Sequence, residues 1–201
     1  VGVASLVAAL LDQGTTARTA AEIAETIDSV GGDSDTGAGR DLSYAHVLVM
    51  KDSLDLGMNL LADELRNPSF AEAEMERQRQ QILSALKVSY DDPEYIADIV
   101  FDRLVYGFNP YGAPASGTPD SLPRITRADL QAFHQRWYVP NNCLLAVVGD
   151  VTAEEAFAAV TRAFGDWAKR EVPADTATDP PQPTRRVIVV DKPGAVQTEV
   201  R

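Results

Sequence analysis

The sequence predicts an α+β domain, because expected helices and strands are interspersed without the regular alternation of a doubly wound fold. Thr19 with Glu22, and Thr152 with Glu155, have the spacing of a capping box, which marks the first turn of a helix. The run from Leu42 to Met50 alternates with a period of two, as in a strand with one buried face. The 201 residues allow one domain with its own core and part of a second.

Apolar spacing and capping signals predict seven helices and four strands. Asp92-Pro93 places proline at a first helical position, where its missing N–H costs nothing, and Ser69 with Glu72 has capping-box spacing. The expected helices span residues 3–11, 19–30, 54–65, 69–86, 92–105, 130–137 and 152–167. The expected strands span residues 42–50, 143–148, 187–190 and 198–201, with a turn at 192–194.

A change in composition divides the chain. Residues 171–184 carry four prolines and no periodic apolar pattern, which indicates a linker. We therefore expect a first domain at 1–170 and the start of a second at 185–201, since a lone hairpin is not stable by itself. Residue 1 is Val1 and the chain opens inside an expected helix, so we expect the first strands of the first domain to be missing.

The charge and hydropathy of the chain exclude two classes of partner. A formal net charge of −12 and a pI near 4.5 argue against nucleic-acid binding, which needs a basic surface. No apolar run approaches the ~18 residues that span a bilayer. The acidic surface is either a solvated face without a partner or a surface that attracts basic peptides. The solvated face is the simpler interpretation.

The residues that usually carry chemistry are few. His46 and His134 are the only histidines, so the chain contains neither HExxH nor HxxEH. We expect both to have packing roles, and the single cysteine, Cys143, to be a buried inert thiol. The stretch from Asp33 to Gly39 resembles a calcium loop, but its twelfth position is Tyr44 rather than Glu, which favours a turn leading into a strand.

A series of short landmarks resembles peptidase family M16, the pitrilysin, insulinase and mitochondrial-processing-peptidase type, over essentially the whole chain. Each landmark alone is weak, and their number, order and spacing make the resemblance specific. In chain order they are Gly2-Val3-Ala4, Leu10-Leu11-Asp12-Gln13-Gly14-Thr15, Gly31-Gly32, Asn67-Pro68-Ser69-Phe70, Asp92-Pro93, Pro110-Tyr111-Gly112, Gly117-Thr118, Ile125-Thr126, Tyr138-Val139-Pro140-Asn141-Asn142, Val147-Val148-Gly149-Asp150 and Asp191-Lys192-Pro193-Gly194-Ala195-Val196-Gln197.

The resemblance implies a two-layer domain, with helices packed on a largely antiparallel sheet, and a zinc site that this chain has lost. In the family, two histidines at i and i+4 of one helix hold zinc, a glutamate before the second is the general base, and a glutamate on the long helix is the third ligand. In this chain, Ser5 and Ala9 occupy the positions of the two histidines. Ala8 occupies the position of the general base, and Ala85 that of the third ligand. We therefore expect no catalytic residue, no metal ligand and no cofactor in this chain.

The family also presents an edge strand to its peptide substrate, and that segment falls on Ser34, Asp35 and Thr36. Asp35 and Ala38 stand where the family has Asn and Thr, so this chain departs from the pattern there.

The resemblance implies a non-catalytic subunit, which pairs with an HxxEH-bearing zinc peptidase or with a second copy of itself around a peptide chamber. The alternatives are a zinc metalloendopeptidase whose ligands lie outside the visible pattern, and a structural core-type assembly subunit without proteolytic role. We expect a bacterial protein, of the periplasm or cell envelope rather than the cytoplasm.

Overall fold

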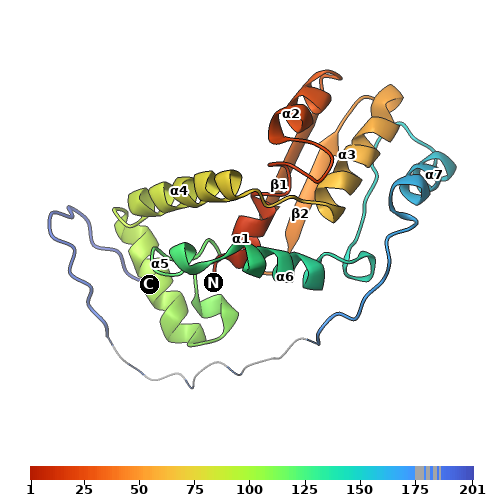
Figure 1. Ribbon diagram of the computed structural model, residues 1–201. Helices are drawn as coiled ribbons and strands as arrows, with labels where there is room; N and C mark the ends of the chain where they lie inside the picture. The colour runs from red at the N-terminus through yellow and green to blue at the C-terminus, as the bar shows by residue number, and fades with distance from the viewer. Residues whose placement is uncertain (175–178, 180–181, 183–184, 186) are drawn as a thin grey trace.

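The computed structural model describes residues 1–174, 179, 182, 185 and 187–201, and it confirms the α+β prediction (Figure 1). Short 3-10 turns connect several of the elements. The α-helices are α1 (Val3–Ala8), α2 (Ala20–Asp28), α3 (Leu54–Arg66), α4 (Glu72–Ser89), α5 (Pro93–Tyr106), α6 (Arg127–Trp137) and α7 (Ala153–Phe164), and the strands are β1 (Asp33–Ala38) and β2 (Ser43–Leu48).

The sheet of the described residues is one antiparallel hairpin. β1 pairs with β2 in a register that sets Asp33 opposite Leu48 and Ala38 opposite Ser43. The turn between them is closed by a 2.8 Å hydrogen bond from the Gly39 N–H to the Leu42 carbonyl. The expectation of a turn at 33–39 is therefore wrong, because this polar stretch is itself a strand. Helices α1, α2 and α3 contact the hairpin, as a two-layer arrangement requires.

The core is organised around α1. Leu6, Val7 and Ala8 have no solvent exposure, and Leu10 and Leu11 in the turn behind them are buried equally well. α1 contacts α4 and α6 as well as both strands. Two smaller clusters complete the core. The main cluster joins α1 to Phe70, Met75, Leu86, Leu122, Ile125 and Leu130, and the smaller ones join α3 to α7 and α2 to α3.

Of the four helix starts that were predicted from a capping residue, three are confirmed. Thr19 and Thr152 each form the predicted capping box, and the Asp92 side chain accepts the Glu94 N–H ahead of Pro93. The prediction of a capping box at Ser69 is wrong, because α4 begins after Ala71 without a side-chain cap. The Ser69 hydroxyl instead donates to the Gly14 carbonyl at 3.0 Å, which ties the start of α4 to the loop behind α1.

The strands expected at 143–148, 187–190 and 198–201 are wrong. These segments are unpaired in the structure, and Leu144 and Val148 are 92% and 96% exposed. A strand needs a neighbouring strand for its backbone groups, and among the described residues no strand pairs with these segments. The expectation of a buried thiol at Cys143 fails for the same reason, since the residue is exposed.

Three further expectations concern the linker, the turn that follows it and membrane spans. The structure covers the expected linker at 171–184 only in part, and its remaining residues lie outside the described ranges. The turn at 192–194 is confirmed by a hydrogen bond from the Ala195 N–H to the Lys192 carbonyl. No helix in the described part of the chain is long and apolar enough to cross a membrane.

One carboxylic acid lies in the core without a partner. Glu64 on α3 has no solvent exposure, and neither of its carboxylate oxygens makes a hydrogen bond. Burial raises the pKa of Glu64 to about 8, and the neighbouring carboxylates of Asp12 and Asp63 add to the effect, while Arg18 opposes it. Glu64 is therefore a neutral acid at pH 7, because an unpaired buried charge would cost more than holding a proton.

The Glu64→Gln variant tests this protonation state. The folded pKa of about 8 exceeds the unfolded value of 4.5, so in that pH interval the folded protein holds one more proton than the unfolded chain. This group's contribution is full below pH 4.5, falls by at most about 1.4 kcal/mol per pH unit, and is lost above pH 8. An amide cannot ionise, so the variant's free energy of unfolding should exceed the parent's increasingly as pH rises.

Urea denaturation across that pH interval measures the difference. Glu25→Gln, at an exposed site on α2, is the matched control and should follow the parent. If Glu64→Gln also follows the parent at every pH, Glu64 is ionised and partnered in solution, and its assignment as a neutral acid is incorrect.

Candidate functional site

The positions on α1 that would carry a metal site hold small side chains with structural contacts. The Ser5 hydroxyl donates to the Ala115 carbonyl at 2.8 Å, so its oxygen is engaged with the loop that precedes Gly117. Ala8 is fully buried, and Ala9 is half-buried at the end of the helix. The methyl groups of the two alanines can neither donate a lone pair nor accept a proton, so α1 offers no pair of ligands and no general base.

Close backbone contact fixes the start of α1. Gly2 and Gly117 both have a φ of +90°, and a Cβ added to Gly2 would lie 3.0 Å from the Gly117 Cα. Only glycine both adopts this positive φ readily and, having no Cβ, lets the two backbones come this close. The Gly2 and Gly117 landmarks therefore have a shared physical cause, since together they hold the loop against the helix that carries Ser5.

The long helix supplies no third ligand. Ala85 is exposed on α4, and its carbonyl accepts a 3.2 Å hydrogen bond from the Ser89 hydroxyl. Within the described ranges, no group of three or more His, Cys, Asp or Glu side chains could hold a metal ion. The chemistry of these positions therefore does not fit zinc, which needs lone pairs from nitrogen, sulfur or carboxylate oxygen.

The strand with the expected peptide contacts is tied to α1. The Thr36 hydroxyl donates to the Ala8 carbonyl at 2.7 Å, so this side chain is used inside the protein. The exposed Asp35 accepts a 3.0 Å hydrogen bond from the Tyr44 hydroxyl of β2. Ser34 lines a cavity of about 280 Å³ together with Asp12 and residues of α2. Of the three expected residues, Ser34 and Asp35 therefore remain open to a ligand.

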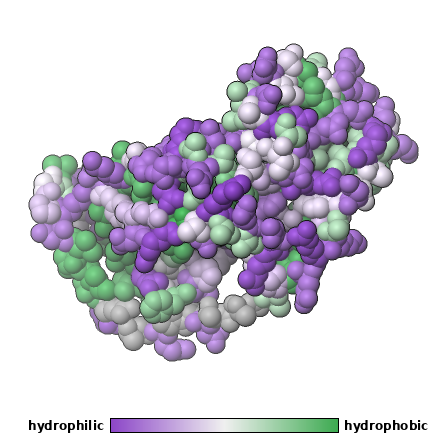
Figure 2. Space-filling model, viewed as in Figure 1, coloured by the Kyte–Doolittle hydropathy of each residue, from purple (hydrophilic) through white to green (hydrophobic). Residues whose placement is uncertain are grey.

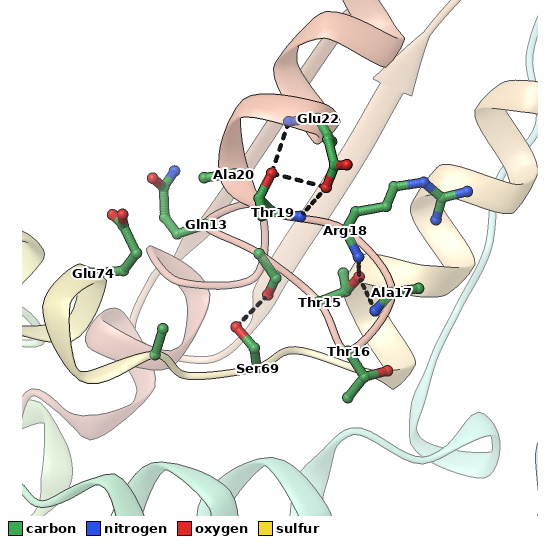
Figure 3. A pocket seen from close by; sticks show the side chains of 12 residues that line it. Gln13, Thr15, Thr16, Ala17, Arg18, Thr19, Ala20, Glu22, Ser69 and Glu74 are labelled. Atoms are coloured by element: carbon green, nitrogen blue, oxygen red, sulfur yellow. Dashed lines mark hydrogen bonds between the residues drawn. The ribbon is translucent and has the colours of Figure 1, made fainter.

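A second cavity, of about 360 Å³, lies where the loop behind α1 meets the starts of α2 and α4 (Figure 3). Its polar groups bond to one another: the Thr19 side chain and Glu22 form the capping box, and Ser69 is bonded to Gly14. The Arg18 guanidinium forms an ion pair with Asp63 on α3. This cavity is a polar junction between elements, with no nucleophile beside a base.

The two histidines have different surroundings. His134 is buried, its Nε2 lies 2.8 Å from the Leu65 carbonyl, and its ring stacks on Tyr138. Burial lowers the pKa of His134, so the ring is a neutral packing residue, as the sequence predicts. His46 does not pack in the core: it is exposed on β2, with its Nε2 3.3 Å from an Asp33 carboxylate oxygen. The packing prediction for His46 is therefore wrong, because that face of β2 is open.

Sequence reasoning missed Glu64 and its neighbour Asp12. The signal was present, because Glu64 follows Leu60 and Leu61 at helical spacing and so shares their buried face. Burial raises the pKa of Asp12, and the carboxylate of Asp35 is among the charges near it. Acidic groups thus gather behind α1, but in the part of the chain that the structure describes they form no cluster that could hold a metal ion.

Comparison with known proteins identifies the family. The family model described as Insulinase (Peptidase family M16) matches residues 1–118, and the one described as Peptidase M16 inactive domain matches residues 124–200. An uncharacterized zinc protease of Mycobacterium leprae is 33% identical over 206 residues, which cover 99% of this chain and 45% of the relative. One from Mycobacterium tuberculosis is 34% identical over 82% of this chain and 37% of its own length.

Solved structures agree with the sequence relatives. A peptidase M16 inactive domain from Pseudomonas fluorescens superimposes with a TM-score of 0.81 at 28% identity, over 88% of this chain and 43% of that chain. The periplasmic protease PqqL from Escherichia coli has a TM-score of 0.76 at 24% identity, over 88% of this chain and 20% of that chain, and shows likeness of fold alone. This chain spans less than half the length of these relatives and structures. On its fold and on the match of more than half its length to the family, the chain belongs to peptidase family M16.

Proposed function

We propose that this chain is a non-catalytic M16 subunit or half, which pairs with an HxxEH-bearing zinc peptidase to form a peptide chamber. The observation that carries the proposal is the state of α1: Ser5 is bonded to a backbone carbonyl, Ala8 is fully buried, and Ala9 ends the helix. Zinc peptidase chemistry needs two imidazoles and a carboxylate on this helix. None of these groups is present in the chain at those positions.

The retained features suit a supporting role. The helix, its glycine-fixed start and its packing are kept while the reactive side chains are absent, so the fold does not depend on the metal. Such a subunit would contribute chamber wall and substrate contacts. The outer edge of β1, with Ser34 and Asp35 open, is the surface we propose for peptide contact. A basic peptide would suit the net charge of −12.

The names of the relatives favour one alternative. Several are called zinc proteases, so a zinc metalloendopeptidase whose ligands lie elsewhere in a longer protein is the competing function. A structural assembly subunit without proteolytic role is the other. For the compartment, we propose the bacterial periplasm or cell envelope, because the structural neighbour PqqL is described as a periplasmic protease.

A cleavage assay separates these functions. The purified chain, the HxxEH-bearing M16 peptidase of its own organism, and their mixture are each given a library of unstructured peptides, with and without a zinc chelator. The proposal predicts background cleavage by the chain alone, and chelator-sensitive cleavage by the mixture that exceeds that of the partner alone. Ser5→Ala is the matched control and should leave the mixture's rate unchanged, because Ser5 supplies only a structural hydrogen bond.

Each alternative has its own result. Chelator-sensitive cleavage by the chain alone would establish the metalloendopeptidase and contradict the proposal. A mixture no faster than the partner alone, combined with co-purification of membrane or respiratory components from the host, would establish the assembly subunit instead.

A further inference from the structure

Helix α5 and the turn after it form a long connection between two fixed points, and we call this connection the arm (residues 93–112). Near its start, Tyr95 packs against the main core cluster, and its ring centroid lies 5.5 Å from that of Tyr90. A few residues beyond its end, Gly117 lies against Gly2 at the start of α1. The contacts that the arm makes between these two anchors therefore decide whether it can move.

Burial does not hold the arm. No residue of α5, all of which lie in the described part of the chain, is fully buried. Three large apolar side chains of the arm face solvent instead: Phe101 is 44%, Val105 39% and Phe108 92% exposed. Figure 2 shows apolar surface at the lower left, where α5 and the last residues of the chain lie in Figure 1. The hydrophobic contribution that fixes α1 in the core is therefore small for α5.

The tip of the β1–β2 hairpin binds the arm through polar contacts. The Arg40 guanidinium donates a 2.9 Å hydrogen bond to the Tyr111 carbonyl and forms an ion pair with Asp102 on α5. Its central carbon also lies 6.0 Å from the centroid of the Tyr111 ring. The neighbouring Asp41 accepts a hydrogen bond from the Tyr111 hydroxyl. Two adjacent residues of one hairpin turn thus bind both α5 and the 3-10 turn that follows it, Pro110–Gly112.

The 3-10 turn and the end of α5 are packed as one unit. The ring centroids of Tyr106 and Tyr111 lie 5.6 Å apart. A Cβ added to Gly112 would lie 2.4 Å from the Gly107 carbonyl oxygen, so the two backbones are in direct contact. A bond to Tyr111 therefore also fixes the last turn of α5.

The contacts at the hairpin tip suit a reversible attachment. A single exposed ion pair contributes little to stability, but a guanidinium that makes several charge-assisted contacts at once contributes more. The Asp102 and Arg40 side chains are 22% and 40% exposed, so water and salt reach the ion pair. Salt screens such a pair. The attachment can therefore hold the arm and still respond to ionic strength.

We propose that the hairpin tip is a latch: Arg40 and Asp41 hold the arm against the domain, and the arm opens between its two anchors when these contacts are lost. The Thr36 hydroxyl fixes β1 to α1, so the hairpin is the fixed side of the latch and the arm is the side that moves. The position of α5 then depends on the state of the hairpin turn. This device needs neither zinc nor a partner chain, so it stands or falls independently of the proposed function.

Hydrogen–deuterium exchange of the backbone amides tests the latch. A released helix of 14 residues is only marginally stable in water, so opening of the arm exposes the α5 amides to exchange. In Arg40→Ala at low ionic strength, the α5 amides should exchange about tenfold faster than in the parent, while the α3 amides keep their rate. Salt at about 1 M should accelerate α5 exchange in the parent and change the variant little, because the variant has lost the ion pair that salt screens.

Two further variants complete the test. Arg162→Ala is the matched control: it removes the same kind of side chain from another exposed ion pair, the one with Asp55 on α3, and should leave α5 exchange unchanged. Adding Asp102→Asn to Arg40→Ala should cause little further acceleration, because the two residues act through one contact.

Three results would overturn the proposal. Equal α5 exchange in Arg40→Ala and the parent would show that the hairpin tip does not hold the arm. Equal acceleration of α3 and α5 in Arg40→Ala would show that the substitution weakens the whole fold rather than opening a latch. A large further acceleration on adding Asp102→Asn would show that Asp102 holds α5 through some contact other than Arg40.

Discussion

The burial of α1 is the constraint on which the rest of the structure depends. Leu6, Val7 and Ala8 have no contact with solvent, and α1 touches the hairpin, α4 and α6 at once. Protein interiors are close-packed, so such a position accepts an alanine methyl group and resists anything larger. In an active member of the family this helix supplies ligands and a base. Here the same helix is a core element: its one polar side chain, Ser5, donates to the Ala115 carbonyl, and its Ala8 carbonyl accepts from the Thr36 hydroxyl.

The surroundings of α1 follow from this arrangement. Gly2 and Gly117 bring a loop close enough for the Ser5 hydroxyl to reach the Ala115 carbonyl. On the other side, Thr36 reaches the Ala8 carbonyl and fixes β1 against the helix. The strand proposed for peptide contact is thus held in place by hydrogen bonds that need no metal. This explains how a family scaffold keeps its geometry when its chemistry is absent, and why a supporting role remains open to it.

The sequence predicted the elements whose signals are local. Capping boxes at Thr19 and Thr152, and the proline start of α5, are set by side chains within one turn, and they appear as expected. The strands at 143–148 and 187–190 were expected from composition, but a strand depends on a neighbour that local sequence does not specify. The candidate site was predicted through position in a family pattern, whereas Glu64 was missed because a charged residue is rarely expected in a core.

The central claim is that the family's metal position cannot hold zinc in this chain. Anomalous diffraction at the zinc absorption edge, from crystals grown with equimolar zinc, tests it most directly. We predict no anomalous peak within bonding distance of Ser5, Ala9 and Ala85, and a zinc ion found among those three residues would contradict the account.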